Sequence, residues 1–278
     1  MPKIFNLFSM TEAELVFTHV MRCDRTALYL DRDSVLDKTV SGRLSAVLRR
    51  RAGGEPLAYI LGTQEFMGFS FEVDQVVLIP RMETEILVET AVNYAAGAPE
   101  HRGTGLKILD VGTGSGNISV SLARLLPDAA IDALDISEEA LSVARKNARL
   151  NNVEQRVRFI HSDLFNCSYE RRATSYELIV SNPPYIPAGE IARLQPEVRR
   201  EPRIALDGGK DGLDFYRRII KDSPCCLKEG GYLLMEIGFG QREAVEEILK
   251  ESKRFDIEEI VKDYSGIERV VVAQKRRF

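Results

Sequence analysis

The chain of 278 residues is 44% hydrophobic, 29% charged and 8% aromatic, which is typical of a folded globular protein and excludes collagen-like and disordered classes. This length is enough for roughly two domains. Asp plus Glu number 42 and Lys plus Arg number 38, so the net charge of −4 supplies no overall positive field for a nucleic acid. Nucleic acid is therefore disfavoured as a partner, although a local basic patch stays open.

The sequence predicts neither a membrane protein, nor a secreted protein, nor a metal site. No apolar run approaches the ~18 residues of a membrane span, and the apolar stretch after Met1 is too short for a signal peptide. The four cysteines are Cys23, Cys167, Cys225 and Cys226. They show no Cys-x-x-Cys spacing, so we expect free thiols in a reducing cytoplasm. Because the chain has neither an HExxH motif nor a Cys/His cluster, no metal is expected.

Residues 9–61 carry apolar side chains at helical spacing and no strand signal, which predicts a small helical bundle. Ser9 or Thr11 is the candidate N-cap of its first helix, and another helix should end near Gly53. Residues 66–78 then alternate Phe and Val with Gly, which predicts a short hairpin. We expect the junction between two domains at this hairpin.

A helix that follows Pro80 is expected to bury an apolar stripe that includes Met82. Beyond residue 105, strands and helices alternate, which is typical of βαβ units around a parallel sheet. The strands are expected at 107–111, 130–134, 157–160, 178–181, 231–237, 257–261 and 269–273, and the helices at 117–126, 138–150, 214–227 and 242–251. Since no helix separates the last two strands, one of them should be antiparallel. The sequence thus predicts a Rossmann-like α/β fold with a seven-stranded, mostly parallel sheet.

The turn after the first strand of this sheet, DVGTGSG, is the first candidate site. Glycines at alternate positions permit positive φ and let a ligand lie against the main chain. A GxGxxG dinucleotide fingerprint is absent, because the sixth position from Gly112 is Asn117, and this disfavours an NAD-dependent oxidoreductase. The residues expected to bind a nucleoside-like cofactor here are Asp110, Gly112, Thr113, Gly114, Ser115 and Gly116.

Acidic residues also follow the next two expected strands. Asp135 ends the second strand, where a carboxylate can accept hydrogen bonds from both ribose hydroxyls. Asp163 follows the third strand and could accept from an adenine amino group, with Leu164 packing on the ring. The alternative for Asp163 is that it caps a turn.

The strand at 178–181 ends in the segment Asn182-Pro183-Pro184-Tyr185, called the NPPY loop below. Two prolines fix their own φ and remove two N–H donors, which leaves a stiff loop rich in acceptors. The Asn182 carboxamide oxygen and the Pro183 carbonyl can accept both hydrogens of one NH₂ group, and Tyr185 offers a flat face to a planar substrate. A strand stop signal is the alternative. The position favours a site, because loops after parallel strands of one sheet face the same crevice.

Together these motifs resemble class I S-adenosylmethionine-dependent methyltransferases, and six further segments narrow the resemblance. They are 54–60 (GEPLAYI), 65–68 (EFMG), 79–85 (IPRMETE), 144–152 (ARKNARLNN), 201–206 (EPRIAL) and 208–216 (GGKDGLDFY). With them the chain is similar, over nearly its whole length, to the PrmC/HemK family of protein-(glutamine-N5) methyltransferases. The resemblance implies S-adenosyl-L-methionine as the cofactor. It also implies a partner, a class 1 peptide chain release factor whose Gly-Gly-Gln glutamine is methylated, which modulates translation termination.

The resemblance further divides the chain. Residues 1–75 are expected to form a helical domain that binds the release factor, with a hairpin linker at about 62–79, and residues 76–278 the catalytic domain. We expect a cytoplasmic monomer with no direct nucleic-acid substrate. The arginine run at 49–51 could meet an acidic surface or RNA, and the alternative is a solvated helix end that complements the helix dipole.

The resemblance gives the NPPY loop the catalytic and substrate-binding roles. Asn182, Pro183, Pro184 and Tyr185 carry these roles, and Asn182 also contacts the cofactor. Arg81 is expected to orient the loop or contact the partner, with an ordinary surface arginine as the alternative. The nearest competing function is methylation of adenine N6 or another exocyclic amine of a nucleic acid, because the loop suits any planar NH₂ group. The acidic charge balance counts against it. A non-catalytic adaptor is disfavoured by the intact loop.

Overall fold

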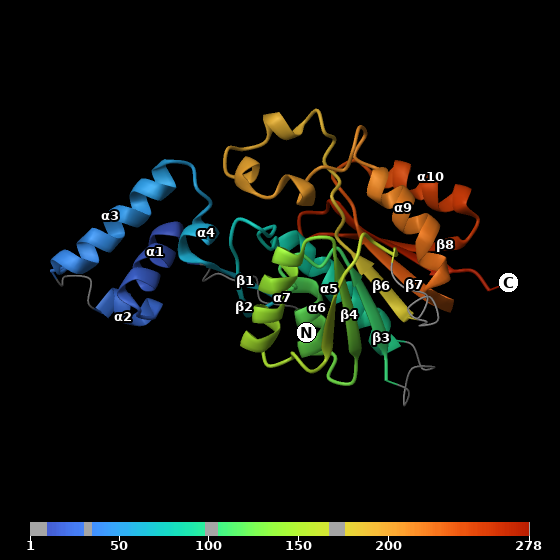
Figure 1. The fold of residues 1–278 in the computed structure, drawn as a ribbon, viewed down its shortest axis with the longest axis horizontal. Coiled ribbons are helices and arrows are strands. Elements are labelled where there is room, and N and C mark those ends of the chain that lie inside the picture. Colours follow the sequence, from blue (N-terminus) through green and yellow to red (C-terminus); the bar gives the residue numbers. More distant parts are fainter. Residues whose placement is uncertain (1–9, 31–34, 98–104, 167–175, 278) are drawn as a thin grey trace.

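The computed structural model describes residues 10–30, 35–97, 105–166 and 176–277, and in this part of the chain a helical bundle precedes a β-hairpin and an α/β unit (Figure 1). The bundle consists of α1 (Glu12–Met21), α2 (Arg25–Leu30), α3 (Lys38–Ala52) and α4 (Leu57–Leu61). Thr11 is the N-cap of α1: its hydroxyl accepts from Glu14 N at 3.2 Å, and Glu14 accepts from Thr11 N at 2.7 Å. Val16, Val20 and Leu44 are the bundle's buried core. The helical prediction is thus confirmed for the described residues.

The hairpin pairs β1 (Thr63–Phe66) with β2 (Phe69–Glu72) around a turn at Met67 and Gly68, whose φ values are 54° and 75°. The predicted hairpin exists, but it lies earlier than 66–78, because the first strand, TQEF, is mostly polar and shows little apolar alternation. Phe66 and Phe71 are 1% and 0% exposed and pack in the core of the α/β unit. The hairpin is therefore an integral part of that unit's packing.

The α/β unit is built on a seven-stranded sheet in the order β5-β4-β3-β6-β7-β9-β8, in which β9 is antiparallel to both of its neighbours. The strands are β3 (Lys107–Val111), β4 (Ala130–Asp135), β5 (Val157–His161), β6 (Tyr176–Ser181), β7 (Leu227–Glu236), β8 (Phe255–Lys262) and β9 (Glu268–Lys275). All seven predicted strands and the mostly parallel sheet are confirmed. The apolar runs identify these strands because both faces of the sheet are covered.

Helices cover the two faces of the sheet. One face packs against α5 (Glu85–Gly97), α6 (Asn117–Leu125) and α7 (Glu138–Leu150), and the other against α9 (Asp214–Asp222) and α10 (Arg242–Ser252). Short 3₁₀ turns occur at Met82–Thr84, Ile191–Arg193, Val198–Arg200, Arg203–Ala205 and Ser223–Cys225. In Figure 1 the segment that carries the middle three runs above the sheet, between the helical bundle and α9.

Two details of the predicted helices were wrong. The helix expected at 214–227 ends at Asp222, because Pro224 has no N–H to continue the helical bonding, and β7 begins at Leu227 instead of residue 231. Met82 is 77% exposed in the 3₁₀ turn before α5, so it is not part of that helix's buried stripe.

Further expectations concern cysteines, membranes and metals. Cys23, Cys225 and Cys226 form no disulfide with one another, whereas Cys167 lies outside the described residues. Among the helices described, none combines the length and apolar character needed to cross a membrane. Across the same residues, no group of three or more His, Cys, Asp or Glu side chains is placed to hold a metal ion.

Candidate functional site

The candidate site lies where the order in which the chain adds strands to the sheet reverses. The chain moves from β3 to β4 on one side of β3, and it returns from β5 to β6 on the other side, so the carboxyl ends of β3 and β6 flank a topological switch point. Val111 and Ser181, the last residues of these strands, are register partners, and the Ser181 hydroxyl donates to Val111 O at 2.7 Å. The glycine turn and the NPPY loop therefore leave the sheet side by side.

The glycine turn provides an open, unobstructed stretch of backbone. Gly112, Gly114 and Gly116 have φ values of 77°, 55° and 80°. A Cβ at Gly112 or Gly114 would meet no atom within 4 Å, whereas one at Gly116 would lie 3.0 Å from Ala144 Cβ of α7. The first two glycines thus leave room beside the main chain, and the third allows α7 to pack closely.

Two carboxylates stand at this turn. Asp110 is fully buried and accepts from Thr113 Oγ1 at 2.6 Å, while its Oδ1 has no hydrogen-bond partner. Burial raises the pKa of Asp110 to about 7. Asp135, at the end of β4, accepts from Gly114 N at 2.8 Å and from Ser137 N at 2.9 Å, and burial raises its pKa as well. Each carboxylate oxygen has two acceptor positions, so Asp135 can still accept from ligand hydroxyls.

Asp163 lies beyond the end of β5, next to the strand that carries Asp135. The two strands pair Asp135 with His161, and Ser162 N donates to Asp135 O at 2.9 Å. The Asp163 carboxylate accepts from Arg218 of α9 at 2.7 Å. Leu164 has a φ of 49°, which turns the chain sharply after Asp163, and its side chain packs on the neighbouring core.

The NPPY loop borders a cavity of about 390 Å³. Its lining includes Arg81, Asn182, Pro183, Tyr185 and Glu201. Asn182 Nδ2 donates to Thr84 Oγ1 at 3.0 Å, so its Oδ1 stays available as an acceptor. Pro184 is not part of the lining. The structure thus brings three of the four loop residues together with Arg81.

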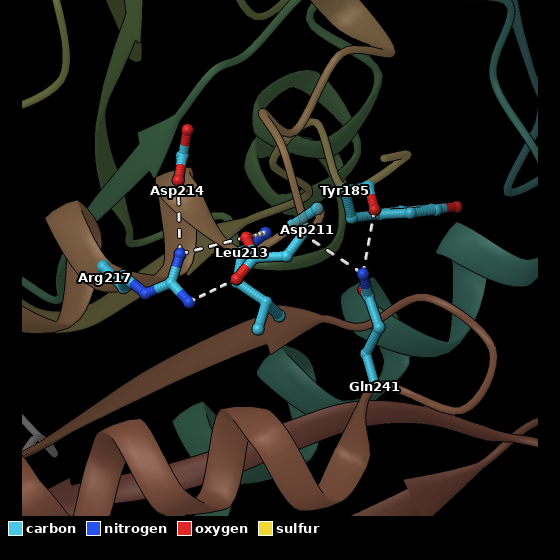
Figure 2. Close-up of polar contacts among 7 residues, drawn as sticks. Tyr185, Asp211, Leu213, Asp214, Arg217 and Gln241 are labelled. Atoms are coloured by element: carbon cyan, nitrogen blue, oxygen red, sulfur yellow. Dashed lines mark hydrogen bonds and ion pairs between the residues drawn. The ribbon is translucent and has the colours of Figure 1, made fainter. Parts of the chain in front are cut away.

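The backbone of the loop is fixed from below by Gln241, which lies just before α10. Gln241 Nε2 donates to Tyr185 O at 2.9 Å and to Gly212 O at 3.4 Å (Figure 2). Gln241 Oε1 accepts from Gly238 N at 3.0 Å and from the Tyr216 hydroxyl at 3.3 Å. A Cβ at Gly212, where φ is 78°, would collide with the Tyr185 carbonyl oxygen, so close backbone contact requires glycine there.

Arg217 of α9 holds the turn at residues 211–214 from the side opposite Gln241 (Figure 2). Its guanidinium donates to both carboxylate oxygens of Asp211, and to Asp214 at 3.2 Å, as Figure 2 shows. Asp211 Oδ1 also accepts from Leu213 N at 3.1 Å. These contacts order the 208–213 segment against which the NPPY loop packs.

Arg81 is not an ordinary surface arginine. It forms an ion pair with Glu201, whose side chain is 1% exposed and also accepts from Ile79 N at 3.1 Å. Glu201 therefore ties the segment after the hairpin to the 195–206 segment across the cavity. The arginine run is also engaged within the chain: Arg51 pairs with Glu12 at 2.7 Å and with Glu197 at 2.5 Å.

Comparisons with known proteins place this geometry in a family. The methyltransferase small domain family matches residues 84–195, and the PrmC N-terminal domain family matches residues 9–62. A release factor glutamine methyltransferase from Geobacter sulfurreducens is 42% identical over 261 residues, covering 94% of this chain and 87% of that protein. One from Thermodesulfovibrio yellowstonii is 38% identical over 271 residues, covering 97% and 94%.

The chain belongs to the release factor glutamine methyltransferase family. This confirms the resemblance inferred from the sequence motifs. Among solved structures, the hMettl16 catalytic domain in complex with the MAT2A 3′UTR hairpin 6 matches with a TM-score of 0.59 and 17% identity, covering 80% of this chain and 82% of that chain. At this identity the likeness shows the methyltransferase fold alone. The identity to the family members therefore carries the assignment.

Four residues that support the candidate site were not predicted from the sequence. They are Thr84, Glu201, Glu236 and Gln241. Thr84 and Glu201 lie inside motifs that were noticed only for their resemblance. One feature of the sequence could have pointed to Glu236: it is an acidic residue at the end of the apolar run YLLME. This is unusual, because buried carboxylates are rare. Gln241 had no signal, because its contacts are to residues distant in sequence.

Proposed function

We propose that this chain transfers a methyl group from S-adenosyl-L-methionine to the side-chain amide nitrogen, N5, of the glutamine in the Gly-Gly-Gln motif of a class 1 release factor. The observation that carries the proposal is the pairing of Val111 with Ser181, which sets a nucleoside-type turn beside a loop that can hold a planar NH₂ group. Membership of the release factor glutamine methyltransferase family supports the same activity.

The residues at the glycine turn fit the cofactor. The open backbone at Gly112 and Gly114 gives room for the nucleoside and amino acid parts, and the Asp110 Oδ1 atom without a partner offers an acceptor. We assign Asp135 to the ribose hydroxyls, and Asp163 with Leu164 to the adenine. Thr113, Ser115, Gly116 and Asn182 complete the assigned cofactor site. When bound, the sulfonium group supplies an electrophilic methyl group.

We assign the NPPY loop to positioning the amide group that accepts the methyl group. An amide nitrogen is a poor nucleophile, because its lone pair is delocalised into the carbonyl. The Asn182 Oδ1 atom and the Pro183 carbonyl would accept the two amide hydrogens and aim the nitrogen, and alignment of this kind can supply up to ~7–11 kcal/mol. Their dipoles also stabilise positive charge as it develops on the nitrogen. Pro184 stiffens the loop, Tyr185 supplies a flat face for the amide plane, and Arg81 orients the loop from across the cavity.

The helical bundle is assigned to recognition of the release factor, with the hairpin linker at about 62–79 placed between the two domains. Because Phe66 and Phe71 belong to the α/β core, we place the first residue of the catalytic domain at the start of β1, Thr63, in place of residue 76. Cytoplasmic location and a monomeric state are part of the same proposal. Cys23, Cys225 and Cys226 form no disulfide with one another, which is consistent with a reducing compartment.

A protein acceptor is favoured over a nucleic acid by the arginine run. Arg50 pairs with Glu55, and Arg51 pairs with Glu12 and Glu197, so two of the three arginines are neutralised within the chain. This leaves less positive charge for phosphate contacts.

Transfer of label from S-adenosylmethionine tests the function. The purified chain is incubated with a class 1 release factor, with the Gln→Ala variant of its Gly-Gly-Gln motif, and with DNA or RNA. Label is expected on the wild-type release factor alone. Label on nucleic acid, or equal label on the Gln→Ala variant, would overturn the proposal.

A further inference from the structure

The carboxylate of Glu236 is buried directly behind the NPPY loop. Glu236 ends β7, the strand next to β6, and the residue is 2% exposed. Its Oε2 atom has no hydrogen-bond partner, and its Oε1 atom is 3.4 Å from the Tyr185 hydroxyl, a long contact. A buried carboxylate with so few hydrogen bonds destabilises the fold. Such a group beside a candidate site is therefore a candidate functional residue.

A threonine lies between this carboxylate and Asn182. Thr84 is 2% exposed, and its Oγ1 accepts from Asn182 Nδ2 at 3.0 Å. The Thr84 hydroxyl is near enough to the Glu236 carboxyl to lower its pKa, as Arg269 and Tyr185 also do. Since Thr84 has one proton and accepts from Asn182, that proton is free to point to Glu236.

The direction of these hydrogen bonds decides whether the Oδ1 atom or the Nδ2 atom of Asn182 faces a substrate. An ionised carboxylate only accepts, so it attracts the proton of the Thr84 hydroxyl, and the Thr84 oxygen is left to accept from Asn182 Nδ2. The Asn182 Oδ1 atom then remains for the acceptor's N–H. A protonated Glu236, or a glutamine in its place, can donate to Thr84, and Thr84 can then donate to Asn182 Oδ1. The amide would turn its NH₂ group outward, which cannot accept a hydrogen bond from the substrate.

We propose that Glu236 is a positioning residue for methyl transfer: through Thr84 and Tyr185, its ionised carboxylate fixes the Asn182 amide and the Tyr185 ring in the orientation that binds the acceptor's NH₂ group. The expected effects on kcat rest on the proposed function. The orientation of the Asn182 side chain, however, can be measured without any methyl-accepting substrate.

Protonation of Glu236 should then switch the site off near neutral pH. The pKa of Glu236 is raised to about 7: burial is the main cause and Glu83 adds to it, while Thr84, Arg269 and Tyr185 oppose the rise. Tyr216 also faces this residue, donating to its backbone oxygen at 3.0 Å. Because the ionised form is the competent one, kcat should increase as the pH rises through about 7.

Glu236→Gln tests the charge with almost no change in shape. We expect kcat above neutral pH to fall about tenfold or more, and the rise of kcat through about pH 7 to disappear, while the Kd for S-adenosylmethionine stays within about twofold. Glu251→Gln, an exposed site in α10, is the matched control and should behave as wild type. Thr84→Val should lower kcat in the same way, and Thr84→Ser, which keeps the hydroxyl, should restore most of it.

An acceptor-free measurement separates this proposal from the proposed function. In NMR spectra, the Asn182 side-chain NH₂ signal, assigned by its loss in Asn182→Ala, should shift between about pH 6 and about pH 8 in wild type but not in Glu236→Gln. The same shift should persist in Glu251→Gln. A signal that does not respond to pH, a Glu236→Gln enzyme with the wild-type rate and pH profile, or equal loss in Thr84→Ser and Thr84→Val would each overturn the role of Glu236. Failure of wild type to methylate a release factor would overturn the proposed function instead.

Discussion

Asn182 is the residue on which the proposed chemistry depends most. Its Nδ2 is engaged by Thr84 at 3.0 Å, and it lines the cavity with Pro183 and Tyr185. Asn182→Ala removes one of two amide acceptors, so we expect kcat to fall about 100-fold or more with the Kd for S-adenosylmethionine within about twofold. Steady-state kinetics and calorimetry check this. Asn93→Ala, an exposed position in α5, is the control, and an Asn182→Ala enzyme as fast as that control would contradict the assignment.

Asp110 gives a pH-dependent prediction for stability. Its pKa is raised to about 7 in the folded chain, above the ~3.9 of an unfolded chain, so the folded state binds the extra proton. The stability that this group contributes is full at acid pH and is lost as the pH rises through about 7. Asp110→Asn removes the titration, so its free energy of unfolding relative to wild type should be higher at about pH 8 than at about pH 5. Urea unfolding at both pH values measures this difference, and an equal difference at both would refute it.

At the scale of elements, the hairpin belongs with the α/β unit. Phe71 is fully buried in that unit's core, 6.0 Å from Phe66 between ring centroids. Phe71→Ala should therefore lower the free energy of unfolding by about 3–5 kcal/mol. Val76→Ala, at a position that is 39% exposed, should change it by less than about 1 kcal/mol. If Phe71→Ala were as mild as Val76→Ala, the placement of the catalytic domain's start at Thr63 would fail.

The elements also show what could be predicted from the sequence. The central strands were predictable, because strands buried on both faces have continuous apolar runs, as in 107–111 and 176–181. The order of the strands in the sheet could not be predicted, because no feature of the β6 sequence specifies β3 as its neighbour. The same holds for the candidate site. The glycine turn and the NPPY loop could be predicted because each is a contiguous motif. The contact of Glu236 with Tyr185 could not, because the two residues are far apart in sequence.

Across the whole molecule, an ion pair and a hydrogen bond connect the helical bundle to the segment above the cavity beside the NPPY loop. Arg51 pairs with Glu197, and Arg200 donates to Gly53 O at the end of α3. Residues of this segment, among them Glu197 and Glu201, line the cavity, so the bundle and the cavity wall are directly coupled. Exposed pairs of this kind contribute only about 0.2–1 kcal/mol each, so the coupling should weaken at high salt.

This coupling predicts a difference between large and small acceptors. Arg51→Ala should lower kcat/KM for an intact release factor several-fold, because the bundle is assigned to its recognition, yet leave kcat/KM for a short Gly-Gly-Gln peptide nearly unchanged. Parallel kinetics with the two acceptors measure this. Arg49→Ala, at an exposed position of the same helix, is the control. Equal losses on both acceptors would show that Arg51 acts on the cavity itself.

Methylation of one amide nitrogen of a protein is the proposed activity, and mass spectrometric mapping of an intact release factor, after incubation with this chain and S-adenosylmethionine, measures it. We expect a single methyl group on the side-chain nitrogen of the Gly-Gly-Gln glutamine, absent when Asn182→Ala replaces the wild-type chain. A methyl group on any other residue, or an unmodified release factor beside a methylated nucleic acid, would contradict it.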